Sequence, residues 1–216
     1  MVSAFHDLMN KTLRSYSVAE REIQLLTSDE EACLNAAVRG DAVDPYWGKV
    51  WDSAIPSAEC VLKNDWALAA GLKTIELGCG LGLVGIAGLL AGLDVTFSDH
   101  EPQAVERAIE NAATNGFENC DGLVMNWAKP VSEKFDVILA SDVLYEASSH
   151  EALLTTASKL LLPSGKFCIG DPGRWLAKDF LNLAMDDGWK VKLFDGDMKQ
   201  ATTPASNQFQ WIELRK

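Results

Sequence analysis

Two short stretches of the sequence combine residue types that could do chemistry. The first is the glycine turn "ELGCGLG", in which an acid, Glu76, precedes glycines at positions 78, 80 and 82. The second is "SDVLY", in which Asp142 and Tyr145 are spaced as D-x-x-Y. Glycines let a ligand approach the backbone closely and leave N–H groups exposed to it. An acid beside an aromatic ring and hydroxyl can orient a polar or cationic substrate group.

The glycine turn matches two cofactor patterns. Residues 80–85 fit the G-x-G-x-x-G of a dinucleotide site, whereas residues 76–82 fit the acid-x-G-x-G-x-G turn of a methyl-donor site. Asp99, about 20 residues past the turn, suits a ribose in either cofactor. A carboxylate at Glu76 would repel a pyrophosphate but attract the amino group or sulfonium of S-adenosylmethionine. We therefore predict S-adenosylmethionine, with S-adenosylhomocysteine as its product.

Two alternatives to this cofactor remain open. One is dinucleotide binding, as in an NAD(P)-dependent oxidoreductase. In the other, Glu76 is a solvated residue at a strand end, and the glycines only allow a helix and a sheet to pack closely.

Short apolar runs and helical patterns alternate from about residue 72 onward, which is typical of an α/β sheet with crossover helices. The predicted strands are Lys73–Leu77, Asp94–Ser98, Gly122–Met125, Phe135–Ala140, Lys166–Ile169, Lys190–Phe194 and Gln208–Leu214. One helix is predicted from Pro102 to just before Gly116. Another, "SSHEALLTTASKLLLPSG", has a serine cap and a stop at Pro163 and Gly165.

The two ends of the chain differ from this central pattern. The last two predicted strands are joined by a segment without helical periodicity, so we expect them to pair as an antiparallel hairpin. The fold class is therefore α/β, a Rossmann-like, mostly parallel sheet with an antiparallel C-terminal hairpin. Residues 1–50 are more polar and less periodic; "SVAEREIQLL" fits strand or helix, and we interpret this segment as a lid or edge extension of a single domain at 51–216.

Composition excludes several classes of function. The net charge of −12, with 31 acids against 19 bases, disfavours nucleic acid as a partner. Five cysteines without a C-x-x-C pair argue against a disulfide framework and against zinc, and favour a reducing cytoplasm. His6 and His150 have no partner at metal spacing, and we expect both at the surface and no metal. The longest apolar run, residues 81–93, is too short for a membrane span, and the N-terminus does not resemble a secretion signal.

Several motifs together resemble the family-16 group of seven-β-strand (class I) protein methyltransferases, which methylate mostly lysine side chains. They are "PYWGKVWDSA", "ELGCGLGLVGIAG", "VTFSD", "NW" and "FDVILASDVLYE". The resemblance runs from about Asp44 to the C-terminus. "DPYW" and "GDPGR" are similar to the branch that methylates the β-subunit of electron transfer flavoprotein, whereas "VWDSA" and "ELGCGLGLVGI" are similar to branches that act on chaperones and other proteins.

The resemblance implies roles for individual residues. Trp51 would cover the donor, the glycine turn would cradle it, Asp99 would hold the ribose, and His100 would lie beside the adenine. Where the family often has an acid before Trp127, this chain has Asn126, whose side-chain oxygen can accept the same hydrogen bond. The predicted cofactor-binding residues are Trp51, Glu76, Gly78, Cys79, Gly80, Gly82, Asp99, His100, Asn126, Trp127 and Ser141.

Asp142 and Tyr145 are the predicted catalytic residues, because they follow the fourth predicted strand at the edge where open α/β sheets bind ligands. Asp142 could accept a hydrogen bond from a lysine amine, and Tyr145 could flank that amine. Alternatively, Asp142 caps the following helix and Tyr145 fills a groove. Arg174 is expected near the substrate mouth. Trp47 and Trp51 would share a face if they lay on a helix, and core packing is expected at least for Trp47.

The predicted function is S-adenosylmethionine-dependent methylation of a protein lysine. A small-molecule N- or O-methyltransferase, an NAD(P)-dependent oxidoreductase and a binding module without turnover are the alternatives. We expect a protein or small-molecule substrate, no nucleic acid and no membrane partner.

Overall fold

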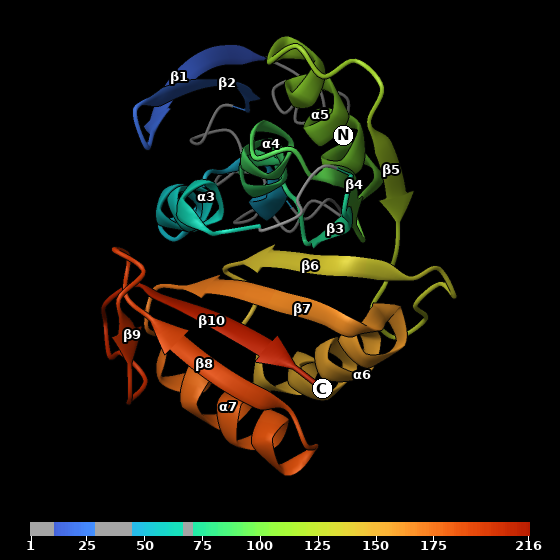
Figure 1. The fold of residues 1–216 in the computed structure, drawn as a ribbon. Coiled ribbons are helices and arrows are strands. Elements are labelled where there is room, and N and C mark those ends of the chain that lie inside the picture. Colours follow the sequence, from blue (N-terminus) through green and yellow to red (C-terminus); the bar gives the residue numbers. More distant parts are fainter. Residues whose placement is uncertain (1–10, 29–44, 67–70) are drawn as a thin grey trace.

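The computed structural model describes residues 11–28, 45–66 and 71–216, and its centre is one eight-stranded sheet (Figure 1). The strand order is β5-β4-β3-β6-β7-β10-β8-β9. The strands are β3 (Lys73–Leu77), β4 (Asp94–Asp99), β5 (Asp121–Val124), β6 (Phe135–Ser141), β7 (Leu161–Asp171), β8 (Lys190–Phe194), β9 (Gln200–Ala201) and β10 (Gln210–Arg215). Strands β3 to β7 pair in parallel, and β10 pairs antiparallel with both β7 and β8. This confirms the predicted fold class.

Helices cover both faces of the sheet (Figure 1). On one face lie α3 (Ala54–Lys63), α4 (Leu83–Leu90) and α5 (Pro102–Thr114); on the other lie α6 (His150–Leu160) and α7 (Trp175–Asp186). Because both faces are covered, the central strands are apolar almost throughout rather than alternating. Alternate residues of a strand therefore belong to different cores.

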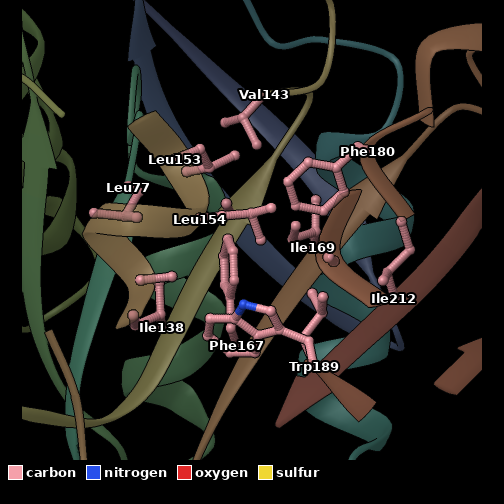
Figure 2. Close-up of a cluster of buried hydrophobic side chains, with 14 of the residues drawn as sticks. Leu77, Ile138, Val143, Leu153, Leu154, Phe167, Ile169, Phe180, Trp189 and Ile212 are labelled. Carbon is pink, nitrogen blue, oxygen red and sulfur yellow. The ribbon is translucent and has the colours of Figure 1, made fainter. Parts of the chain in front are cut away.

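Two apolar cores follow from this arrangement. Ile138 of β6 and Phe167 of β7 pack with α6 and α7, in the cluster of Figure 2 that also contains Leu153, Phe180 and Trp189. The neighbouring residues of the same strands turn to the other face and pack with α3, α4 and α5; they include Val137, Leu139 and Cys168. Within the described residues, no helix is both long and apolar enough to cross a bilayer.

The segment before the main sheet forms a separate hairpin of β1 (Thr12–Val18) and β2 (Arg21–Thr27). "SVAEREIQLL" is therefore strand rather than helix. The hairpin is attached to α5, because the Oδ1 atoms of Asn111 and Asn115 accept hydrogen bonds from the amides of Leu26 and Gln24, at 2.7 and 3.0 Å. The rest of the predicted extension, with His6 and Cys33, lies outside the described residues, and a lid role stays a prediction.

Most predicted elements are present, with differences that have physical causes. The bounds of the predicted strands agree with the observed bounds to about two residues. The exception is β7, which begins at Leu161 rather than at the predicted Lys166. Helix α5 begins at Pro102 and ends before Gly116, which has a positive φ. Ser149 occupies the N-cap position of α6, as predicted, but makes no side-chain cap bond, because its hydroxyl donates to the Glu146 carbonyl instead.

Other differences concern elements and residues whose surroundings the sequence pattern did not reveal. The predicted antiparallel pairing of the last two strands is confirmed by β8 and β10, but β10 lies between β7 and β8, and the connection between the pair contains the additional strand β9. Helix α7 was not predicted, although its buried positions, Ala177, Phe180, Leu181 and Ala184, have helical spacing. His150 is buried rather than exposed and packs edge-on against Phe180.

The close packing of α4 on the sheet depends on Gly85. A Cβ atom added there would lie 2.4 Å from Cε1 of Phe97 and 2.5 Å from Oε2 of Glu76. We expect Gly85→Ala to lower the free energy of unfolding by about 1–3 kcal/mol through overpacking, measured by urea denaturation. Gly88→Ala in the same helix is the matched control, because its nearest atoms lie at 3.1 Å or more. Equal midpoints for the two variants would contradict the packing role.

Candidate active site

A cavity of about 480 Å³ opens at the carboxyl ends of β3, β4 and β6. This is the size range of sites for small molecules and cofactors. Eleven of the thirteen predicted site residues line it, namely Trp51, Glu76, Gly78, Cys79, Gly80, Asp99, His100, Trp127, Ser141, Asp142 and Tyr145. Gly82 and Asn126 do not line it.

The glycine turn forms the floor of the cavity between β3 and α4. Gly78 and Gly80 both have positive φ values, 66° and 49°, which glycine adopts without strain. The amide of Cys79 donates to the Ser98 carbonyl, and the amide of Gly80 donates to Oδ2 of Asp99 at 3.1 Å. These bonds tie the turn to the end of β4, so the ends of two adjacent strands are held together around one space.

Gly82 has a packing role instead. It is the residue before α4, with φ 82°, and a Cβ atom there would lie 2.9 Å from the Ala108 Cβ and 3.1 Å from the Phe97 ring. The alternative of glycines that serve close packing is therefore correct for Gly82, whereas Gly78 and Gly80 face the cavity.

Glu76 is buried, with only 3% of the residue exposed, so the alternative of a solvated strand-end residue is wrong. Burial raises the pKa of its carboxyl group to about 8; the charge of Asp99 raises the pKa further, and the amides of Gly85 and Val84 lower it in part. The Oε2 atom has no hydrogen-bond partner among the described residues. A desolvated carboxyl group at a cavity wall, with one oxygen unused, would regain its charge beside a cationic ligand group and is suited to one.

Asp99 is buried at the end of β4 and organises the neighbouring turn. Its Oδ1 accepts the amide of Glu101 at 3.1 Å and lies 3.1 Å from Nδ1 of His100. His100 is mostly exposed and is also 3.6 Å from a carboxylate oxygen of Glu101. Each Asp99 oxygen thus has one backbone donor and can accept a further bond from a ligand hydroxyl.

An aromatic wall forms another part of the cavity lining, and the Trp47 carbonyl lies against Gly80 of the glycine turn. The wall comes from η1 (Pro45–Gly48) and the residues after it. The indole N–H of Trp51 donates to the Tyr46 carbonyl at 3.1 Å, and the Lys49 ammonium lies 4.9 Å from the Trp51 ring centre. Trp51 lies outside any helix, so Trp47 and Trp51 do not share a helical face. Trp47 is half-buried and lines the cavity as well as touching the core.

Asn126 and Trp127 are neighbours in the chain, but only Trp127 lines the cavity. Asn126 is exposed, and its Oδ1 accepts the amide of Ala128 at 2.8 Å, which is a local turn. Trp127 is half-buried and lines the cavity beside Gly78. The adenine contact predicted for Asn126 therefore stays a prediction.

Asp142 and Tyr145 follow β6 at the mouth of the cavity. Asp142 has a left-handed backbone, φ 59°, and its carboxylate bonds the amide and hydroxyl of Ser53 and pairs with Arg174. It does not cap a helix: the residue before α6 is Ser149. Tyr145 is 63% exposed and does not fill a groove.

Two serines near Asp142, Ser53 and Ser57, were not predicted from the sequence. The Ser141 hydroxyl lies 3.0 Å from the hydroxyls of both Ser53 and Ser57, which belong to the start of α3. Small hydroxyl residues near a helix start usually indicate a cap, so the sequence offered no specific signal. Arg174 does line the mouth, as predicted.

No group of three or more His, Cys, Asp or Glu side chains suited to a metal occurs in the described part of the chain. Four cysteines are free thiols there, and Cys33 lies outside it. Burial raises the pKa of the Cys79 thiol well above its usual value, so it is held as a neutral small residue in the turn.

Glu76 gives a prediction on stability. Its carboxyl binds a proton more tightly in the folded protein, with a pKa of about 8 against 4.5 for the free group, so its contribution to stability is lost as pH rises through this window. We expect Glu76→Gln to gain a few kcal/mol relative to wild type between about pH 5 and pH 8, since one pKa unit is about 1.4 kcal/mol. Urea denaturation at several pH values measures this. A pH-independent difference between the two proteins would contradict it.

Comparison with known proteins agrees with this geometry. Residues 35–183 match the family of lysine methyltransferases. A histidine protein methyltransferase 1 homolog of Dictyostelium discoideum is 34% identical over 55% of this chain and 40% of that protein. The electron transfer flavoprotein β-subunit lysine methyltransferase of Danio rerio is 30% identical over 61% of this chain and 51% of that protein. The chain thus spans about half the length of these curated relatives, or less.

A solved structure extends the comparison to the fold. A TehB-like S-adenosylmethionine-dependent methyltransferase from Corynebacterium glutamicum superimposes with a TM-score of 0.62 at 22% identity, over 87% of this chain and all of that one. At this identity the likeness concerns the fold, which is that of class I methyltransferases. Together with the family match over most of its length, this shows that the chain belongs to the lysine methyltransferase family.

Proposed function

We propose that the protein is an S-adenosylmethionine-dependent methyltransferase that acts on a lysine side chain of a protein. The observation that carries this proposal is the buried Glu76 carboxylate, with an unbonded oxygen, beside Asp99 in a cavity formed by the glycine turn. This pair suits a ligand that carries a positive charge and ribose hydroxyls, and it disfavours a pyrophosphate.

The residues of the cavity fit the donor. Glu76 would hold its cationic amino acid portion, Asp99 its ribose hydroxyls, and Gly78 and Gly80 would let it lie against the backbone. Trp51 would cover it from the aromatic wall. The bound donor supplies an electrophilic methyl group on a sulfonium; this chain's residues bind it, orient it and exclude water.

The acceptor would enter between Asp142 and Tyr145. Methyl transfer needs a neutral amine aimed along the line of the breaking bond, so orientation and desolvation supply most of the catalysis. Asp142 would accept a hydrogen bond from the amine, and the Tyr145 ring would attract the charged form before its proton leaves to water. Because the proton leaves to water, Asp142 would orient the amine rather than serve as its general base.

A protein acceptor is supported by the family and by charge. Both curated relatives described above are named as protein methyltransferases. The net charge of −12 would steer a basic segment of a partner protein toward the chain, whereas it opposes nucleic acid. We propose a cytoplasmic location on the basis of the cysteine content. We also propose that residues 1–50 are a lid or an edge extension of the domain.

The proposed function is tested with methyl-labelled S-adenosylmethionine and a cell lysate, followed by mass spectrometry of labelled proteins. We expect label on a lysine of one or a few proteins.

Calorimetry with S-adenosylmethionine should show binding. Glu76→Gln and Asp99→Asn should each weaken this binding at least about tenfold, because each variant loses one charge-assisted contact. Label confined to small metabolites would overturn the protein acceptor, and tight binding of NAD(P) without binding of the methyl donor would overturn the reaction class.

The acceptor residues give a separate prediction. Asp142→Asn is expected to lower turnover about a hundredfold, because misplacement of the amine by about 1 Å has an effect of that size, with donor affinity unchanged. Tyr145→Phe is expected to lower turnover less, because the ring is kept. Asp179→Asn on the exposed face of α7 is the matched control. Unchanged turnover in both site variants would remove these residues from the mechanism.

A further inference from the structure

The carboxylate of Asp142 already has partners from this chain on both oxygens. Its Oδ2 accepts the amide of Ser53 at 3.0 Å and also the Ser53 hydroxyl. Its Oδ1 lies 2.5 Å from Nη1 of Arg174. A cation is therefore in place at the oxygen on which a substrate ammonium would otherwise pair.

Arg174 is fixed by a buried acid behind it. Oδ1 of Asp171, at the end of β7, accepts the amides of Gly173 and Arg174 at 2.8 Å each, and Oδ2 lies 3.6 Å from Nη1 of Arg174. The side-chain nitrogen of Gln210, in β10, donates a hydrogen bond to Oδ1 of Asp171 at 3.3 Å. Asp171 and Gln210 are buried, whereas Arg174 is partly exposed and lines the cavity.

The turn that presents Arg174 requires glycine. Gly173 has φ 82°, and a Cβ atom there would lie 2.4 Å from the Gln208 carbonyl oxygen. The insertion of β10 beside β7 thus determines where the guanidinium lies, and the pair with Asp142 is part of the fold rather than a surface contact.

The pairing matters because of the proton on the acceptor. A lone carboxylate stabilises an ammonium and raises the pKa of the amine, which is the wrong direction for a nucleophile that must be neutral. A guanidinium on that carboxylate opposes this shift and leaves oxygen lone pairs that can still accept a hydrogen bond.

Other charged and titratable groups face the same mouth and remain the same in every variant of the test. They are Lys49 after η1, Glu76 of β3, Asp99 of β4, His100 and Glu101 before α5, Tyr145 and Glu146 after β6, and Asp171 of β7. The effect of Arg174 is therefore measured as the difference in the pH dependence of kcat between variants, and not from the pH dependence of one protein alone.

We propose that Arg174 is a positioning residue that occupies Asp142, so that the carboxylate aims a neutral lysine amine and does not hold it as an ammonium. The proposal rests on the proposed function. In the step it serves, the amine first loses a proton to water, and its lone pair then forms the N–C bond as the C–S bond of the donor breaks. The bonding electrons go to sulfur, which becomes neutral, and the positive charge passes to the methylated nitrogen.

The test compares wild type, Arg174→Gln and Arg174→Lys with saturating donor. The acceptor is the protein labelled in the lysate experiment, purified, and kcat and KM are measured from about pH 6 to pH 10. In Arg174→Gln, Asp142 no longer pairs with a guanidinium and should hold the acceptor lysine as an ammonium. The KM for the acceptor is therefore expected to fall several-fold. The kcat near pH 7 should fall about tenfold, and its pH profile should move about one unit to higher pH, since one pKa unit is a factor of ten. Arg174→Lys, which keeps a cation, should restore most of the wild-type profile.

The double variant Asp142→Asn, Arg174→Gln separates this role from a structural one. Without the carboxylate, removal of the arginine should no longer shift the profile. A loss of kcat that is equal at all pH values in Arg174→Gln, or a shift that persists in the double variant, would overturn the inference while the methyltransferase function stands. A wild-type protein that binds the donor but labels no protein would overturn both.

Discussion

Burial of the Glu76 carboxylate at the end of β3 is the constraint on which the site depends. Side chains alternate along the strand, so Ile75 and Leu77 face α6 and α7 while Glu76 faces α4. The acid therefore meets the first turn of α4, where Gly85 leaves room for it. Because the group is desolvated, its pKa is raised to about 8, and a cationic ligand is the partner that would restore its charge.

The glycines of one short segment consequently serve different purposes. Gly78 and Gly80 turn the chain under the cavity with positive φ angles, whereas Gly82 and Gly85 allow α4 to pack against Phe97 and α5. The same short pattern thus lines a cavity and also allows close packing, which is why the pattern alone could not separate two cofactor classes.

The antiparallel end of the sheet has a role in the site as well as in closing the fold. Strand β10 lies next to β7, and Gln210 bonds Asp171, which holds the turn that carries Arg174. Asp142 at the end of β6 meets that arginine and also Ser53 before α3. Arg174, about 30 positions further along the chain, is brought to Asp142 because β6 and β7 are neighbours and their ends lie side by side. Ser53, about 90 positions earlier, reaches the same carboxylate because α3 packs against β7.

The sequence by itself determined most strands of the main sheet, the α/β class, the glycine turn and the acids at the strand ends, because these follow from local periodicity and from residue types with few conformational alternatives. It also identified the residues of the D-x-x-Y. Only the tertiary structure decided that Glu76 is buried, that Gly82 packs closely against Ala108 and Phe97, that His150 is internal and that Asp142 is paired with Arg174. Burial and ion pairing depend on which distant segments meet, and the spacing of residues along a strand or helix does not contain that information.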